Sequence, residues 1–151
     1  MRMKLWYFDD TGARRKSLCF EVTVMSELKA GLRGTAAWTV TEDMSARVCR
    51  SGSLDVFATP MLVALMECAA CDAVKDALPE GSTSVGTEMD VKHTAASPVG
   101  AEVSAEAVLT AVDGRKLTFE ITACEGVKII GTAKHERFIV DAARFMGKLA
   151  K

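Results

Sequence analysis

The longest apolar segment of the chain covers residues 56–71 and is hydrophobic around almost its whole circumference when read as a helix, which is expected to continue to about residue 77. Such a pattern predicts a helix that is buried on all sides. Thr59 and Pro60 suit its start. A threonine hydroxyl can accept hydrogen bonds from the free backbone N–H groups, and a proline at the first helical position has no N–H group that would be left unpaired. The Pro and Gly of residues 78–81 are expected to end the helix.

Alternating apolar and polar positions predict strands on both sides of this helix. The Asp113-Gly114 pair between two such runs predicts a tight hairpin, and Asp141 is placed to cap a short terminal helix. Residues 46–49 are expected to be extended, and residues 50–53 are expected to form a polar loop. The expected strands are residues 34–41, 83–93, 102–112, 115–124 and 127–140.

The order of elements is a strand, a buried helix and four antiparallel strands. It predicts an α+β fold in which an antiparallel β-sheet wraps around a central helix, and it is the order of a hotdog fold. Residues 1–25 form an N-terminal extension, interpreted as an added hairpin or a loosely attached tail. Residues 9–12 suit a turn, and residues 18–24 alternate like a strand. Residues 26–141 then form the main domain, and residues 142–151 form the terminal helix.

The composition fits one globular domain of 151 residues with 49% hydrophobic and 26% charged positions. The formal net charge of −1 gives no electrostatic footprint for nucleic acid. No apolar run is long enough to cross a bilayer, and residues 1–24 lack the apolar core of a signal peptide, so a cytoplasmic protein is expected. The five cysteines are expected to be reduced and to pack as small hydrophobes. This includes Cys68 and Cys71, whose CxxC spacing favours zinc or redox chemistry only weakly. No metal or cofactor is expected.

One carboxylate, Glu67, interrupts the apolar helix between Met66 and Cys68. A lone carboxylate is costly to bury as an anion, so its pKa should rise unless a neighbouring group compensates. Such a conflict within a segment favours a functional residue. The alternative is a structural glutamate that bonds to a backbone group or faces a subunit interface.

Two histidines are the other candidates for chemistry. One side of the strand expected at residues 83–93 consists of Val85, Thr87, Met89, Val91 and His93. His93 should therefore point with the apolar residues toward the core, and the alternative is a histidine at a frayed sheet edge. His135 is expected to pair structurally with its neighbours Glu136 and Arg137.

Several short motifs, in this order and at this spacing, resemble the fluoroacetyl-CoA thioesterase-like family of hotdog proteins. The resemblance covers roughly residues 29–141. The motifs are Gly-Ser-Leu-Asp-Val-Phe-Ala-Thr-Pro at residues 52–60, Leu65-Met66-Glu67, Ser84-Val85-Gly86-Thr87, Val91-Lys92-His93 and His135-Glu136-Arg137.

The resemblance implies hydrolysis of an acyl-CoA thioester by Thr59, Glu67 and His93, with coenzyme A as part of the substrate and no separate cofactor. It also implies that the backbone of Gly86 lies close to the substrate. Members of the family are expected to be homodimers with active sites at the subunit interface.

The side chains suit that reaction. Glu67 either attacks the carbonyl or acts as a base on water, and His93 either activates the water or protonates the leaving thiolate. The oxyanion is expected at backbone N–H groups near the helix start. Thr59 is either a helix cap alone or also holds Glu67 or the substrate, although a regular helix puts the two about 12 Å apart. Phe57 and Arg137 are candidates for substrate contact, Arg137 through a CoA phosphate.

The acyl group is left open by the sequence. Residues 50–55 are small and polar and give no aromatic cover to an acyl pocket, so a group larger than fluoroacetyl is equally expected. The expected function is hydrolysis of a small or medium acyl-CoA. The alternative is a non-catalytic hotdog protein that binds acyl-CoA. An enoyl-CoA hydratase is less well supported, because Asp55 precedes the helix in a loop.

Overall fold

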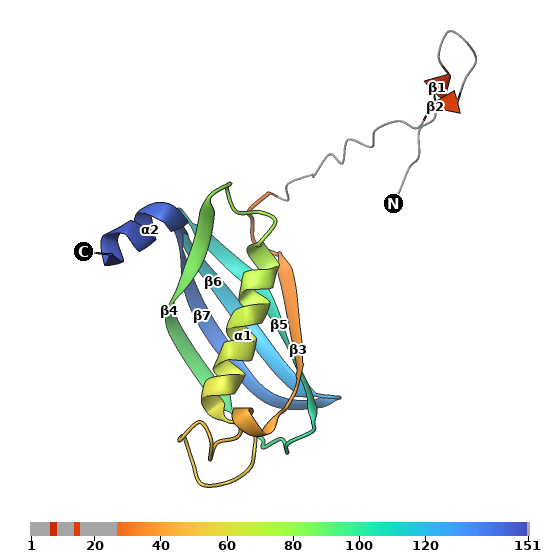
Figure 1. Ribbon diagram of the computed structural model, residues 1–151, viewed down its shortest axis with the longest axis vertical. Helices are drawn as coiled ribbons and strands as arrows, with labels where there is room; N and C mark the ends of the chain where they lie inside the picture. Colours follow the sequence, from red (N-terminus) through yellow and green to blue (C-terminus); the bar gives the residue numbers. More distant parts are fainter. Residues whose placement is uncertain (1–6, 9–13, 16–26, 151) are drawn as a thin grey trace.

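A five-stranded antiparallel sheet curls around one long helix, α1, in the computed structural model, which describes residues 7–8, 14–15 and 27–150 (Figure 1). The strand order is β3-β5-β6-β7-β4, so β3 and β4 form the two edges of the sheet. This is the α+β arrangement that the sequence predicts. The elements are β3 (Arg33–Thr39), η1 (Glu42–Met44), α1 (Thr59–Val74), β4 (Ser82–His93), β5 (Glu102–Asp113), β6 (Lys116–Glu125), β7 (Lys128–Asp141) and α2 (Ala142–Leu149).

Part of the N-terminal extension is described as two short strands, β1 (Tyr7–Phe8) and β2 (Arg14–Arg15), which pair antiparallel. Such pairing suits the hairpin interpretation. The turn expected at residues 9–12 and the strand expected at residues 18–24 lie outside the described residues.

The core lies between α1 and the concave face of the sheet. Leu62, Leu65 and Met66 of α1 are fully buried there. Burial of each such side chain contributes about 1.5–3 kcal/mol, so the helix and the sheet stabilise each other. The side of β6 that alternation marks as apolar is also buried, and it consists of Leu117, Phe119, Ile121 and Ala123.

Gly34 lets the edge strand β3 lie directly against α1. A Cβ atom at this position would overlap the backbone of Ala69 and Ala73. Because helix backbone cannot rotate away, we expect Gly34→Ala to lower the free energy of unfolding by at least about 2 kcal/mol. The matched control is Gly147→Ala in α2, where nothing lies within 4 Å of the added methyl group and alanine favours the helix. Urea unfolding measures both variants, and an unchanged midpoint for Gly34→Ala would contradict the close approach.

A bulge at Thr87 changes the side to which residues of β4 point. The pairing of β4 with β7 shifts directly after Gly86. The expected side is confirmed after the bulge, where His93 faces α1. Before the bulge the prediction is wrong, because Ser84 and Gly86 face inward instead of Val85. One extra residue in a strand reverses the alternation on which the prediction depends.

Residues 46–50 form consecutive turns, where the sequence predicts an extended segment over residues 46–49. Cys49 N–H donates to Ser45 O at 2.9 Å, a bond between residues four apart that an extended chain does not make. Four residues are too few for periodicity to separate a strand from a turn. The polar loop predicted at residues 50–53 is confirmed, since these residues have no helix or strand structure.

One face of α1 is open, which contradicts the prediction of burial on all sides. Cys68 and Cys71 are exposed on it, so their predicted role as core residues is wrong, and the Glu67 side chain beside them is 40% exposed. Apolar character alone does not tell whether a helix face packs within its own chain. The edge strand β4 lies beside α1 (Figure 1), and its Gly86 lies against Glu67.

Helix α2 starts as the sequence predicts. The Asp141 carboxylate accepts a bond from the Arg144 N–H at 2.8 Å and so caps the helix. In the described part of the chain, no helix has both the length and the apolar character needed to cross a bilayer.

Candidate active site

Thr59 and His93 form the first half of the candidate site, where the start of α1 meets the end of β4. Thr59 Oγ1 lies 2.9 Å from His93 Nδ1 and forms a hydrogen bond with it. The prediction of Thr59 as a helix cap is wrong, because Ala58 occupies that position and no side chain bonds to the free N–H groups. Thr59 is the first helical residue, and its hydroxyl holds the histidine instead of the helix end.

His93 is half-buried and rests against Phe57. The Phe57 ring is fully buried and meets the His93 ring edge to face, with centroids 6.5 Å apart and planes at 78°. Together with Thr59 these residues line a cavity of about 270 Å³. The sequence candidate Phe57 thus packs under His93 and also reaches the cavity.

The surroundings of His93 favour the neutral form of its ring. Desolvation on burial is the main cause that lowers the pKa of His93. Its Nε2 atom is buried and has no hydrogen-bond partner among the described residues. A neutral imidazole with one free ring nitrogen can take up or deliver a proton.

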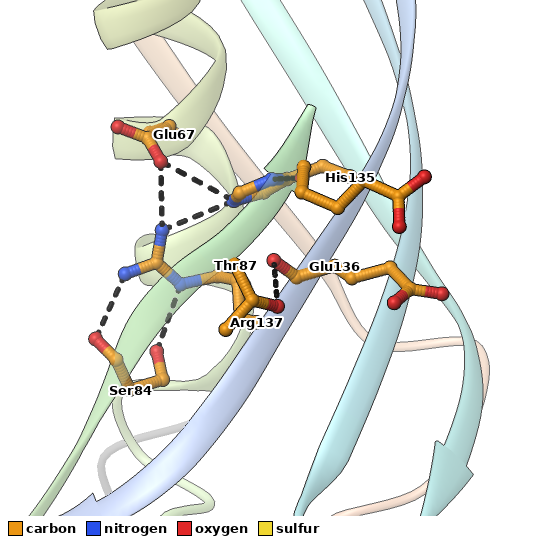
Figure 2. A network of polar contacts seen from close by, with 7 residues as sticks. Glu67, Ser84, Thr87, His135, Glu136 and Arg137 are labelled. Carbon is orange, nitrogen blue, oxygen red and sulfur yellow. Dashed lines mark hydrogen bonds and ion pairs between the residues drawn. The ribbon is translucent and has the colours of Figure 1, made fainter. Parts of the chain in front are cut away.

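Glu67 forms the second half of the site, in the middle of α1 (Figure 2). Its Oε1 atom lies 3.6 Å from Arg137 Nη1 and 3.6 Å from His135 Nε2, both on β7. Gly86 of β4 lies against the carboxylate, because a Cβ atom there would overlap Oε1. Glu67, Gly86 and His135 line a cavity of about 250 Å³. The carboxylate is neither lone nor fully buried, and Arg137 supplies the charge that compensates it.

Arg137 is buried, and its donors are used inside the protein. Nε donates to Ser84 Oγ at 2.9 Å and Nη2 donates to Ser84 O at 2.8 Å. Nη1 lies 3.1 Å from His135 Nε2 and also faces Glu67. The expectation that Arg137 binds a CoA phosphate does not fit this burial, since its side chain is only 7% exposed. The structure places it beside the carboxylate instead.

The structural pairing predicted for His135 is confirmed for one neighbour only. His135 contacts Arg137, whereas Glu136 lies on the opposite face of β7 and accepts a bond from Lys116 Nζ at 3.1 Å. Successive residues of a strand point to opposite faces, so both neighbours cannot reach the same histidine. Burial, with a smaller contribution from the charge of Arg137, lowers the pKa of His135.

The two halves of the site do not meet within one chain. Thr59 and Glu67 are eight residues apart on α1, which corresponds to about 12 Å along the axis. Among the described residues, His93 bonds to Thr59, while Glu67 Oε1 lies 3.6 Å from Arg137 Nη1 and from His135 Nε2. The expected trio of Thr59, Glu67 and His93 is therefore present as two separate groups.

The Glu67 carboxylate lies so close to the backbone of residue 86 that only a glycine fits there. The methyl group of Gly86→Ala would overlap Glu67 Oε1 and press on the His135 ring. We expect kcat for the hydrolysis that the family resemblance implies to fall about a hundredfold, because a shift of about 1 Å in a catalytic group can cost that much. Steady-state kinetics beside the control Gly147→Ala measures the effect. Unchanged kcat in a folded Gly86→Ala variant would contradict the contact.

Two parts of the site have little signal in the sequence. Ser84 binds Arg137 through both its hydroxyl and its carbonyl, but strict alternation assigns it to the outer face of β4. Glu88 O lies 2.7 Å from His135 Nδ1, and a backbone carbonyl has no sequence signature. Knowledge of the bulge would have placed Ser84 correctly. In the described ranges, no group of three or more His, Cys, Asp or Glu side chains is arranged to hold a metal ion.

Known proteins share this fold and are related in sequence. A family model described as fluoroacetyl-CoA-specific thioesterase matches residues 40–143. The fluoroacetyl-CoA thioesterase of Streptantibioticus cattleyicolor is 41% identical over 95 residues, which are 63% of this chain and 68% of the relative. A solved structure of the fluoroacetyl-CoA thioesterase FlK superposes with a TM-score of 0.77 at 34% identity, and the match covers 83% of this chain and 97% of that one. A hot-dog-like protein from Thermanaerovibrio acidaminovorans matches with a TM-score of 0.72 at 21% identity over 80% of this chain and 89% of that one, which supports the fold alone.

The antiparallel sheet wrapped around a central helix and the match to the FlK structure place the chain among the hotdog-fold thioesterases. The chain is a thioester hydrolase of this class, which acts on acyl-CoA. Within the class it belongs to the fluoroacetyl-CoA-specific thioesterase family, whose model matches residues 40–143. The fold and the family resemblance predicted from the sequence are confirmed.

Proposed function

We propose that this thioesterase acts on acyl-CoA with a small acyl group and that Glu67 acts on the thioester carbonyl. The main support is the position of the Glu67 carboxylate, which is half-exposed, held by Arg137 at one oxygen and opposite Gly86. A cavity of about 250 Å³ beside this carboxylate leaves room for an acyl group there. The curated relative from Streptantibioticus cattleyicolor is also named for a two-carbon acyl group.

Glu67 can act in two ways. As a nucleophile it bonds to the carbonyl carbon and expels the CoA thiolate, and water then opens the mixed anhydride. As a general base it takes a proton from the water that attacks the carbonyl. Single turnover in ¹⁸O-labelled water separates these routes, because only the anhydride route can leave the label in the Glu67 carboxylate, where mass spectrometry of the peptide detects it.

We assign His93 the tautomer in which Nδ1–H donates to Thr59 Oγ1. When Glu67 is the nucleophile, this tautomer leaves the lone pair of Nε2 free to take a proton from the water that opens the anhydride. The lowered pKa of His93 keeps this form populated at neutral pH. Thr59 then orients the base and does not itself attack the substrate.

A second copy of the chain completes the site in this proposal. β4 is an edge strand and lies beside the open face of α1. If two β4 strands pair antiparallel about a twofold axis, the His93 end of one lies beside the start of the other. Thr59 and His93 of one copy then approach Glu67 and Gly86 of its partner, which closes the gap of about 12 Å.

The dimer also explains why α1 reads as a fully buried helix. A partner on its open face would cover Cys68 and Cys71, which are exposed in the single chain. Light scattering should give twice the chain mass of 16.2 kDa, and the monomer mass would contradict this arrangement. The cytoplasmic location expected from the sequence stays a prediction.

Release of free thiol from a panel of short, medium, branched and aromatic acyl-CoAs tests the proposed substrate. We expect turnover to be fastest for two- to four-carbon acyl groups, because the relative from Streptantibioticus cattleyicolor is named for a two-carbon acyl group. Faster turnover of medium or aromatic groups would overturn the small-acyl proposal. Binding of acyl-CoA without any thiol release would instead favour the alternative, a hotdog protein that binds acyl-CoA without turnover.

A further inference from the structure

We infer that His135 is a positioning residue that holds the Arg137 guanidinium in place against Glu67. This inference rests on the proposed action of Glu67 on the thioester. His135 lies on β7 beside Arg137 (Figure 2). It is buried next to the bulge of β4 and against the ring of Phe119. Its two ring nitrogens have different partners, and these partners define what the ring does.

The Nδ1 atom of His135 must carry a proton. It lies 2.7 Å from Glu88 O, and a carbonyl oxygen can only accept a hydrogen bond. Glu88 directly follows the bulge at Thr87, where the ladder between β4 and β7 is irregular. The bulge therefore makes a main-chain acceptor available to a buried histidine, which fixes both its tautomer and its ring plane.

The Nε2 atom of His135 is then the acceptor in a neutral ring. Arg137 Nη1 donates to it at 3.1 Å, because a guanidinium has donors only. Burial and the nearby guanidinium both favour the neutral ring, in agreement with the lowered pKa of His135.

Arg137 is in this way held from two sides. Ser84 takes its Nε and Nη2 donors, and His135 takes a donor of Nη1, the nitrogen that lies 3.6 Å from Glu67 Oε1. A neutral His135 with a lone pair at Nε2 cannot donate to the carboxylate, so Glu67 is directed to the guanidinium alone. The chain of contacts runs from the main chain of the bulge through His135 and Arg137 to Glu67.

Two substitutions separate the functions of the two ring nitrogens. The amide of His135→Asn can still donate to Glu88 O near the place of Nδ1 but offers no acceptor at the place of Nε2. His135→Gln can put an amide oxygen there. We expect kcat to fall between about tenfold and a hundredfold in His135→Asn with little change in KM, and to recover largely in His135→Gln. Equal losses in two folded variants would overturn the inference and indicate a packing role.

A double-mutant cycle tests whether His135 acts through Arg137. In an Arg137→Lys background, His135→Asn should cost little further kcat, because the guanidinium that it positions is gone. Full additivity of the two losses would overturn the inference.

Nitrogen NMR of the His135 ring tests the geometry without any reference to turnover. At pH 7 the spectrum should show a protonated Nδ1 and an unprotonated Nε2. It should also show an Nε2 signal that shifts in Arg137→Lys. A protonated Nε2, or no shift, would overturn the inference. Absence of wild-type turnover on every acyl-CoA would instead overturn the proposed function, so the two failures are distinguishable.

Discussion

Glu67→Gln is expected to lower kcat for acyl-CoA hydrolysis by at least about a hundredfold while leaving the fold and acyl-CoA binding intact. Glutamine has nearly the shape of glutamate, but its amide neither attacks a thioester carbonyl nor accepts a proton from water. The contact of Oε1 with Arg137 Nη1, at 3.6 Å, remains open to the amide oxygen, so the structure of the site should be preserved. Thiol release and acyl-CoA binding, measured on the same preparation, give kcat and affinity separately.

The matched control is Glu80→Gln, which removes an exposed carboxylate from the turn after α1. It changes the net charge by the same amount and touches neither half of the site. The control should retain wild-type kcat and KM. A Glu67→Gln variant that keeps more than about a tenth of wild-type kcat would contradict the role of Glu67 as nucleophile or base.

His93→Ala is expected to have an effect of similar size, because it removes the base that Thr59 orients. We expect kcat to fall at least about a hundredfold. The matched control is Thr59→Ser, which keeps the hydroxyl at the His93 Nδ1 atom and should therefore keep most of the activity. Loss of activity in Thr59→Ser equal to that in His93→Ala would contradict the positioning role of the hydroxyl.

The pH dependence of stability follows from two histidines, His93 and His135. Burial lowers the pKa of both His93 and His135 in the folded protein below the value in the unfolded chain, which is about 6.5. Between the two values the unfolded chain binds more protons, so acid favours unfolding. The neutral rings thus contribute stability that is fully present above about pH 6.5 and declines as the pH falls toward the lowered pKa values.

Urea unfolding between neutral and mildly acidic pH measures this contribution. His93→Ala should make the loss of stability in acid smaller than in wild type, because one of the two titrating rings is absent. An equal or steeper loss in the variant would contradict the lowered pKa of His93.

Regular patterns of the sequence predicted the fold well. The alternation at Leu117 and Phe119 gave the buried side of β6, and the Asp113-Gly114 pair marked the hairpin between β5 and β6. Both patterns depend on local backbone geometry, in which the period of side chains and the demands of a tight turn are fixed by nearby residues. Asp141 was identified for the same reason, because a helix cap acts within a few residues.

The site was predicted less completely, because its geometry depends on departures from regular structure. The bulge at Thr87 turns Ser84 and Gly86 inward. No local sequence pattern predicts the one extra residue that a bulge adds to a strand. Thr59 was expected to cap the helix and, in the alternative, to hold Glu67 or the substrate, but its hydroxyl bonds to a histidine 34 residues away. Arg137 was expected to contact a CoA phosphate. Its contact with Glu67 was not predicted, because Glu67 lies on another element and is distant in sequence.

The central claim is that Glu67 of one copy works with Thr59 and His93 of the other. It is tested most directly by a dimer of one Glu67→Gln chain and one His93→Ala chain, co-expressed with two different affinity tags and purified over both. Each variant alone is expected to be nearly inactive. In the mixed dimer one site receives its Glu67 and its His93 from the two intact positions, so kcat per dimer should return to about half the wild-type value. A mixed dimer as inactive as its two parents would show that each chain supplies both groups to its own site, which contradicts the account.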